Sequence, residues 1–506
     1  MPNSSDLATY VSAWNNGAGT ITIDGKTWED EEFFTSRVKP RMRFQNTATQ
    51  IYKDRVPYNA TTGAGTDKRL VYWVPVSDDL RNATPTNALP NSVYDQEVFS
   101  LWSYMDHWGN WTAPYGWTPG VFADIAHKNG VAVSGVASVP YGGINGTWST
   151  AFNAITGVDA TKVAKFLYYH GQDGLGYNSE WNGYAPTSLH NMHSKIKSYY
   201  DSQNPNNLWE VIWYGGTMDS GNCSFDQGVD SRNNKNFTNA SMFLNYNWNS
   251  TSTMTSSINY AKNEVKKNPF YIYAGMNQQG GEPKSGENWP ILKDYQYSIG
   301  MWAGHNTNIL WLNRQKNGSD ALSKQQTYQQ TNEMFFGNGA RNPAIRQSVK
   351  TYRNHFPDEN FHGCSSMMNA RSTIQMNIGT EPFITYFNLG NGTFFNWRGD
   401  RQNDNPWYNI GIQDYMPTWR WWFAPAWMQT NVTAGTTHMS ADFTWEDAYM
   451  GGSCLKISGT TGEEYLHLFK TDLTGISSKV VKVYYKILAG EGDVRLRLGS
   501  KTAPAT

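Results

Sequence analysis

Charged residues are scarce in this chain of 506 residues, where Asp, Glu, Lys and Arg together make up 16%. The net charge is only −1, so there is no basic excess to attract a nucleic-acid backbone or an anionic membrane surface. No run of about 18 apolar residues occurs, which excludes a membrane-spanning helix. We therefore expect neither a nucleic acid nor a membrane span.

Cysteine is also rare, and its pattern excludes two further classes of protein. The chain has 3 cysteines, far apart in sequence, so at least one must stay unpaired and a disulfide framework is not expected. Their spacing does not match a metal site, and the pair His190 and His193 has no carboxylate nearby to complete one. We expect no metal and no cofactor.

Aromatic residues, in contrast, reach 15%, and tryptophan alone occurs 22 times. Sugars present flat apolar faces ringed by hydroxyl groups, which suit aromatic rings that stack and side-chain amides that both donate and accept. The composition favours a carbohydrate-binding protein. The alternative is a large β-rich core that uses Trp and Tyr as filling.

Eight apolar runs alternate with helical stretches over much of the chain, after a polar, irregular lead-in at residues 1–68. That alternation is typical of parallel strands, and eight is the number that closes a (β/α)8 TIM barrel. We expect residues 1–341 to hold the lead-in and this barrel. The expected strands are 70–76, 98–106, 130–140, 174–180, 208–216, 241–248, 269–277 and 297–304.

The pattern changes near residue 342, where short strand-like runs follow one another without helices. We expect an all-β module at residues 342–430. A β-sandwich at 431–506, about 75 residues long, is shorter than the roughly 100 of a complete sandwich and would be a truncated, carbohydrate-binding-like module. The fold class is α/β, a TIM barrel followed by one or two all-β sandwich modules.

The sharpest local signal is residues 173–181, DGLGYNSEW, at the fourth predicted strand. Side chains alternate along a strand, so Asn178 and Glu180 point the same way, and catalytic groups of such barrels cluster at strand ends. Glu180 is a candidate general acid. Ordinary glycosidases need two carboxylates, whereas in the substrate-assisted variant the 2-acetamido group of the sugar is the nucleophile. An amide beside one carboxylate fits the second scheme.

In this order along the chain, several segments resemble family 85 of the glycoside hydrolases, the endo-β-N-acetylglucosaminidases. The resemblance covers nearly the whole chain, and its segments are individually weak but jointly specific. They are FTSRVKPR at 34–41, DGLGYNSE at 173–180, VIWY at 211–214, FLNYNW at 243–248, TYFNLG at 385–390, PTWRW at 417–421 and DAYMGGSCL at 447–455.

The resemblance implies a role for each matching residue. Glu180 matches the acid/base, Asn178 the residue that orients the acetamido group, and Tyr214 the tyrosine that helps hold it. Trp248 matches an aromatic residue of the acceptor side. Phe225 stands where the family often has Trp, so acceptor-side stacking could differ.

Further substrate-binding residues are predicted around these. Asn245, Tyr246 and Trp213 belong to the two matching strands, and Asn277 stands where the family usually has Asp. Trp102 alternates with Tyr104 and Asp106 on a predicted strand and could face the cleft.

The resemblance implies hydrolysis, with retention, of the β-1,4 bond in the N,N′-diacetylchitobiose core of N-linked glycans, and transglycosylation as a side reaction. The partner would be an N-glycan or a glycoprotein. A chitinase-like hydrolase is the alternative within enzymes, although chitinases carry D-x-E where this chain has Asn178-x-Glu180. The alternative from another class is a non-catalytic glycan-binding protein on a barrel scaffold. An extracellular glycan favours secretion, to the periplasm or cell surface with the export signal removed, over a cytoplasmic location.

Overall fold

The computed structural model describes a set of segments that includes most of the barrel. They are residues 7–17, 34–43, 68–74, 90–111, 115–139, 157–225, 228–245, 248–278, 289–302, 318–337, 363–368, 370–373, 383–425, 437–460, 463–469, 480–492 and 494–495. No helix within these segments is long and apolar enough to cross a membrane.

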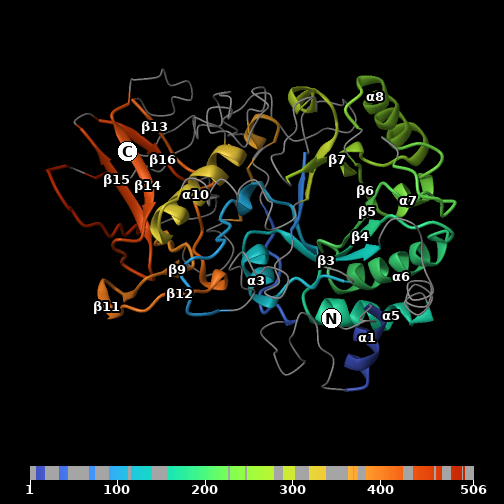
Figure 1. The fold of residues 1–506 in the computed structure, drawn as a ribbon, viewed down its shortest axis with the longest axis horizontal. Coiled ribbons are helices and arrows are strands. Elements are labelled where there is room, and N and C mark those ends of the chain that lie inside the picture. Colours follow the sequence, from blue (N-terminus) through green and yellow to red (C-terminus); the bar gives the residue numbers. More distant parts are fainter. Residues whose placement is uncertain are drawn as a thin grey trace.

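Eight parallel strands form a closed barrel, as the alternation of the sequence predicts. Each strand pairs with the next, and β1 pairs with β8 to close the sheet. Most of the barrel strands lie right of the centre in Figure 1. The strands are β1 (Leu70–Trp73), β2 (His107–Trp111), β3 (Ala132–Val139), β4 (Gly174–Ser179), β5 (Glu210–Tyr214), β6 (Ser241–Phe243), β7 (Ile272–Asn277) and β8 (Ser298–Trp302).

Helices lie on the outside of this barrel (Figure 1), most of them between successive strands, while α1 precedes β1 and α10 follows β8. The ends of α3 follow from its flanking residues: Pro119 precedes the helix, and Gly130 adopts φ 69° just past its end. Asp159 caps α5, its carboxylate accepting from the N–H groups of Thr161 and Lys162. The helices are α1 (Leu7–Asn15), α3 (Gly120–Lys128), α5 (Ala160–Tyr169), α6 (Thr187–Gln203), α7 (Asn234–Asn239), α8 (Thr251–Tyr260) and α10 (Ala321–Gly337).

The second strand is not where the sequence pattern predicts it. Residues 98–106 form no strand and include the short 3-10 helix η1 (Trp102–Tyr104), whereas β2 begins at His107. The prediction is wrong because β2, with sequence HWGNW, buries polar groups that do not resemble a core strand. His107 is fully buried against Ser134, at 2.8 Å, and Asn110 donates to the carbonyl of Trp117.

The inside of the barrel is filled by aromatic rings next to glycines. Trp73 of β1 stacks on Phe243 of β6, with ring centroids 4.7 Å apart. A side chain could not replace the glycines that face them. A Cβ at Gly109 would lie 2.6 Å from the Trp73 ring, and one at Gly300 would lie 2.7 Å from the Phe243 ring. The large rings therefore fill space that glycines on other strands leave open.

At the N-terminal end, an ion pair sits inside the barrel. Arg69, just before β1, donates two hydrogen bonds to the Glu210 carboxylate of β5, at 2.9 and 2.7 Å. Ser241 and Tyr273 also donate to that carboxylate, at 2.5 and 2.8 Å. Burial favours the protonated acid, but the charges of Arg69 and His107 and these hydrogen bonds hold the pKa of Glu210 at about 2.

The described residues after the barrel form four two-stranded antiparallel sheets. The sequence pattern predicts strands at 383–389, 410–415, 454–458 and 465–469. The first two ranges form none, and the second of them holds the 3-10 helix η8 (Ile410–Ile412), whereas the last two ranges do contain strands. The strands are β9 (Asn391–Gly392), β10 (Phe395–Trp397), β11 (Asp400–Asn403), β12 (Trp407–Tyr408), β13 (Trp422–Ala424), β14 (Met439–Thr444), β15 (Cys454–Gly459) and β16 (Tyr465–His467).

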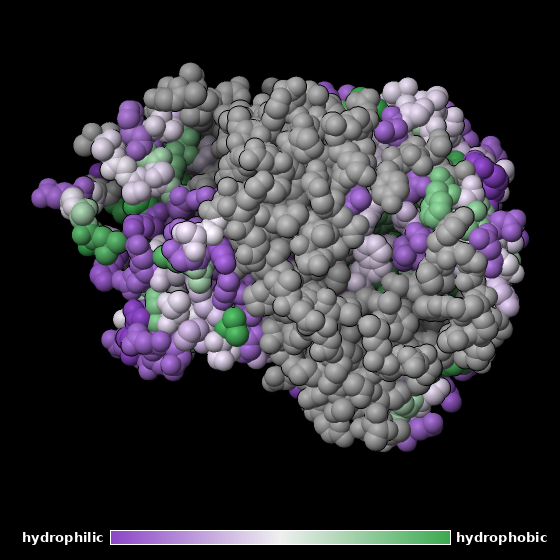
Figure 2. Space-filling view, viewed as in Figure 1, coloured by the Kyte–Doolittle hydropathy of each residue, from purple (hydrophilic) through white to green (hydrophobic). Residues whose placement is uncertain are grey.

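One of these sheets crosses the predicted boundary between the two β modules. β13 pairs with β16, so residues on both sides of position 430 share a sheet. The domain boundaries at 341 and 430 stay predictions. The β region lies at one side of the barrel beside α10 (Figure 1), and its surface over the fully exposed β11 is hydrophilic in Figure 2.

A buried ion pair joins this region to the rest of the chain. Arg420, which is fully buried, lies 3.3 Å from the Glu333 carboxylate of α10 and donates to the backbone carbonyl of Ser100. Gln413 adds two amide hydrogen bonds, to the carbonyls of Phe99 and Leu389. The β region is thus fixed against the segment that leads into β2.

Candidate active site

Asn178 and Glu180 lie together at the C-terminal end of β4. Gly176 faces the barrel interior, because a Cβ there would lie 2.9 Å from Val136, which belongs to the cluster inside the barrel. Tyr177 points outward and forms a hydrogen bond with His193 of α6 at 3.0 Å. Alternation then places Asn178 on the inward side, and Glu180 follows it on the same side. The structure therefore brings together the two residues on which the sequence analysis depends.

Glu180 is half-buried, and its environment favours the protonated acid. Burial raises the pKa of its carboxyl group above the ordinary value of 4.5. Among the described residues, none donates a hydrogen bond or forms an ion pair to this carboxylate. The other described residues at inward positions of the strand ends carry no carboxylate. They are Trp111, Asn178, Tyr214, Asn245, Asn277 and Trp302.

Tyr214 lies at the end of β5, next to Asn178. The register pairs Tyr177 with Trp213, so Asn178 and Tyr214 follow at the same level on neighbouring strands. The side chain of Tyr214 is 6% exposed and belongs to the aromatic cluster inside the barrel. A tyrosine, an amide and a carboxyl group therefore share one edge of the barrel mouth.

Phe225 extends this edge outward. It is 37% exposed, and its ring lies edge-on to Tyr214 with centroids 6.4 Å apart. An exposed ring at the rim of a mouth can stack on a sugar face. The contact of Phe225 with a sugar stays a prediction.

The polar residues predicted on β6 and β7 differ in exposure. Asn277, at the end of β7, is half-buried beside Trp302, its partner in the register with β8. Asn245 is fully buried just after β6. Tyr246, also predicted to bind substrate, lies outside the described residues.

Three tryptophans predicted to bind substrate are buried instead, and this corrects the sequence analysis. Trp102 is on η1 and not on a strand, and its ring N–H donates to Gln413 at 2.9 Å. Trp213 points out of the barrel and packs between Tyr177 and Trp181, with centroids 5.2 Å away in each case. The prediction assumed that an aromatic residue in a matching strand faces the cleft, but strand alternation turns every second one outward.

Trp248 is likewise fully buried, and its ring N–H donates to the carbonyl of Gly275 at 2.9 Å. The indole therefore braces the loop after β6 against β7. A side chain with no exposed surface offers no face for a sugar, so Trp248 supports the mouth from behind in this structure.

Two inward tryptophans were missed by the sequence analysis. Trp302, at the end of β8, is 6% exposed, and its ring lies 6.5 Å from Tyr214 and 5.7 Å from Phe243. Trp111, at the end of β2, lies 6.5 Å from Trp73. Alternation along the predicted eighth strand could have identified Trp302, while Trp111 was missed because the second strand was misplaced.

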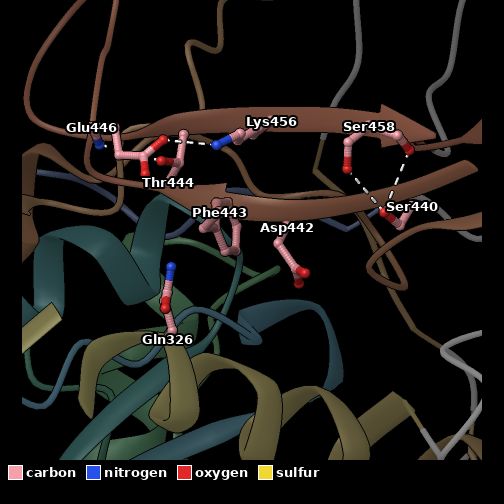
Figure 3. Close-up of a pocket in the computed structure, with 8 residues that line it drawn as sticks. All are labelled: Gln326, Ser440, Asp442, Phe443, Thr444, Glu446, Lys456 and Ser458. Atoms are coloured by element: carbon pink, nitrogen blue, oxygen red, sulfur yellow. Dashed lines mark hydrogen bonds and ion pairs between the residues drawn. The ribbon is translucent and has the colours of Figure 1, made fainter. Parts of the chain in front are cut away.

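A polar hollow elsewhere on the molecule holds none of these residues. Figure 3 shows it between α10 and the β14–β15 hairpin, with an ion pair between Lys456 and Glu446 at 2.8 Å. Its one aromatic ring, Phe443, is buried, so the hollow offers no ring surface. The barrel mouth is the candidate active site. The hollow is lined by Gln326, Ser440, Asp442, Phe443, Thr444, Glu446, Lys456 and Ser458.

Two curated proteins are similar to this chain over most of its length. A cytosolic endo-beta-N-acetylglucosaminidase of Danio rerio is 21% identical over 383 residues, covering 73% of this chain and 45% of that protein. One of Homo sapiens is 22% identical over 440 residues, covering 82% and 50%. The chain thus spans about half the length of these relatives. Their names place them in the cytosol, so they lend no support to the prediction of secretion.

The fold is similar to that of a solved structure, the glycoside hydrolase domain of Endo-D from Streptococcus pneumoniae R6. The TM-score is 0.69 at 21% sequence identity, over 88% of this chain and 66% of that one. At this identity the likeness supports the fold alone. The family model described as glycosyl hydrolase family 85 matches residues 81–395 and includes β4 with Asn178. Because that match covers more than half of the sequence, the chain belongs to glycosyl hydrolase family 85.

Proposed function

We propose that this chain is an endo-β-N-acetylglucosaminidase that cleaves the β-1,4 bond in the N,N′-diacetylchitobiose core of N-linked glycans. The observation that carries the proposal is the pairing at the end of β4. There a half-buried carboxyl group, Glu180, lies beside an inward amide, Asn178, with no second carboxylate at the described strand ends. Family membership and the names of the curated relatives support the same reaction. Those names favour the cytosol over secretion.

The chemistry follows from having one carboxyl group. Glu180 donates its proton to the leaving glycosidic oxygen while the acetamido oxygen of the substrate attacks the anomeric carbon from the opposite face. The leaving sugar departs and an oxazolinium ion remains. Glu180, now a carboxylate, takes a proton from a water molecule that attacks the same carbon and opens the ring, so the configuration is retained.

Asn178 and Tyr214 would act on the acetamido group that forms the oxazolinium ion. The Asn178 amide would accept a hydrogen bond from the acetamide N–H and orient the group for attack, while the Tyr214 hydroxyl would hold the acetamide oxygen. Their equal level on neighbouring strands supports this assignment. Trp302 and Phe243, packed beside Tyr214, would exclude water from the reacting carbon.

Around this centre, Phe225 and Asn277 are the exposed or half-buried candidates for contact with neighbouring sugars. Phe225 would stack on the acceptor side, where an incoming sugar in place of water would give transglycosylation. Asn245, Trp213 and Trp248 would act by supporting the backbone of the mouth, whereas Trp102 on η1 donates to Gln413 of the β region.

The test is incubation of the protein with a high-mannose glycopeptide, followed by mass spectrometry. We expect a peptide that carries a single GlcNAc. Intact glycopeptide would contradict the proposal and favour a non-catalytic glycan-binding protein, and a peptide without any sugar would indicate an amidase.

The residue roles are tested by substitution. Glu180→Gln should lower kcat by about 10²-fold to 10⁴-fold, the typical contribution of a general acid. Asn178→Ala should strongly slow hydrolysis of the N-glycan, while the variant should still accept a pre-formed oxazoline donor. Glu446→Gln in the hollow of Figure 3 is the matched control, and it should leave kcat unchanged. Near-normal turnover by Glu180→Gln would place the acid elsewhere.

A further inference from the structure

The loop that follows β5 is tied closely to the residues on either side of Glu180. Thr217 in this loop is 1% exposed, and its N–H donates to the carbonyl of Ser179 at 2.9 Å. Its hydroxyl group accepts from the N–H of Trp181 and donates to the carbonyl of Trp181, both at 3.0 Å. One side chain thus satisfies both backbone groups of the residue after Glu180, and its backbone holds the residue before.

Thr217 is itself held from behind. Its carbonyl accepts from the ring N–H of Trp213 at 3.0 Å and from the side-chain amide of Asn236 at 2.9 Å. Trp213 belongs to β5 and Asn236 to α7, so the contacts anchor Thr217 to two elements of the scaffold. Trp213, whose indole is too deeply buried to contact a sugar, thus helps to hold Thr217 in place.

The two loops are joined at further points. The backbone N–H of Cys223 donates to the side-chain carbonyl of Asn182 at 2.6 Å, and that of Gly183 donates to the carbonyl of Gly221 at 2.9 Å. Gly216 permits the close approach, because a Cβ there would lie 2.3 Å from the carbonyl oxygen of Ser179. The β4 and β5 loops therefore form one hydrogen-bonded unit.

This unit matters because the Glu180 carboxyl group has no hydrogen-bond partner among the described residues. Its position is set by the backbone on either side of it, and Thr217 holds that backbone on both sides. We propose that Thr217 is a positioning residue that fixes the direction of the Glu180 carboxyl group towards the leaving oxygen. The proposal rests on Glu180 being the acid/base of the proposed function.

Thr217→Val is the decisive substitution, because valine keeps the shape and removes the two hydroxyl hydrogen bonds. A displaced acid should lower kcat on the N-glycan by about 10-fold to 100-fold, the effect of a misplacement near 1 Å. KM should change less than kcat, because the residue does not touch the sugar. Thr217→Ser keeps both hydrogen bonds and should recover most of the lost rate.

A second substrate separates positioning of the acid from general damage. In a dinitrophenyl β-glycoside of the donor glycan, dinitrophenolate replaces the reducing-end GlcNAc and departs without needing a proton. Thr217→Val should release dinitrophenolate in the first turnover, before Glu180 acts as the base, nearly as fast as the wild type does. Thr118→Val is the matched control, since Thr118 is also fully buried and its hydroxyl donates to the carbonyl of Ser134 at 2.6 Å, away from the β5 loop.

The outcomes are distinct. A loss confined to the N-glycan, recovered by serine and absent in Thr118→Val, supports the proposal. Equal losses on both substrates would make Thr217 merely structural, and wild-type kcat in Thr217→Val would refute any role. If instead Glu180→Gln cleaves the N-glycan normally, the proposed function itself has failed, which the same series of assays reveals separately.

Discussion

Replacing Glu210 by glutamine should destabilise the barrel without touching the candidate active site. The Glu210 carboxylate accepts two hydrogen bonds from Arg69 and one each from Ser241 and Tyr273, at the end of the barrel opposite Glu180. The neutral amide removes the charge that compensates Arg69, whose side chain is only 18% exposed. Breaking a buried ion pair from one side costs about 3–5 kcal/mol.

That free energy translates into a modest shift of the midpoint of thermal unfolding. Unfolding entropy is about 2.1 cal/mol/K per residue, or about 1 kcal/mol/K for a chain of 506 residues. The expected decrease in Tm is therefore about 3–5 °C. Because Glu210 lies far from the mouth, kcat below the transition should stay close to that of the wild type.

The assay is thermal unfolding followed by intrinsic fluorescence, for which the chain has 22 tryptophans. Asp201→Asn is the matched control, because its pair with Lys197 on the surface of α6 is 45–48% exposed and should change Tm by less than about 1 °C. Arg69→Met combined with Glu210→Gln should recover part of the loss, because no uncompensated charge remains. A decrease in Tm no larger than that of Asp201→Asn would refute this account of the barrel base.

The same residue predicts a pH dependence with a definite sign. Folding lowers the pKa of Glu210 from 4.5 to about 2, so its ionised form stabilises the fold above pH 4.5. That stabilisation disappears as the pH falls through the folded value. The difference in Tm between the wild type and Glu210→Gln should therefore shrink between pH 4.5 and about 2.

Two further predictions concern the mouth. Because burial raises the pKa of Glu180, kcat/KM on the N-glycan should fall on the alkaline side at a pH above the ordinary value of 4.5, as the acid loses its proton; a pH profile that titrates at 4.5 would contradict this. Phe225→Ala should raise the acceptor concentration needed for transglycosylation by about 2-fold to 12-fold, because an aromatic contact is lost, whereas Phe225→Trp should not raise it. Product ratios measured by chromatography at several acceptor concentrations would test this prediction.

The order of strands and helices could be predicted because it depends on local patterns. Pro119 and Gly130 mark the ends of α3, and the short apolar runs mark seven of the eight barrel strands. The failure at β2 has a physical cause. Its polar residues His107 and Asn110 are buried because Ser134 and the Trp117 carbonyl satisfy them, and those partners come from other segments.

In the candidate site, too, local patterns could be predicted from the sequence and contacts between distant segments could not. Asn178 and Glu180 could be placed together from the alternation of a single strand. Trp213 was misplaced because the identity of a ring does not say which side of the sheet it faces, and Trp102 was misplaced because it lies on η1 and not on the predicted strand. Trp302 contacts Tyr214 only when β8 closes the barrel against β1. The two residues are 88 positions apart in the sequence, and their ring centroids lie 6.5 Å apart.

The sequence by itself determined the alternation of elements, and it placed one carboxyl group and one amide on the same side of β4, because neighbouring residues of a strand have fixed directions. Only the tertiary structure decided how Glu180 is held, since Thr217 reaches both of its neighbours from the loop of another strand. It also decided the pKa directions of Glu180 and Glu210, because desolvation and charge pairing depend on what the folded chain places around each group.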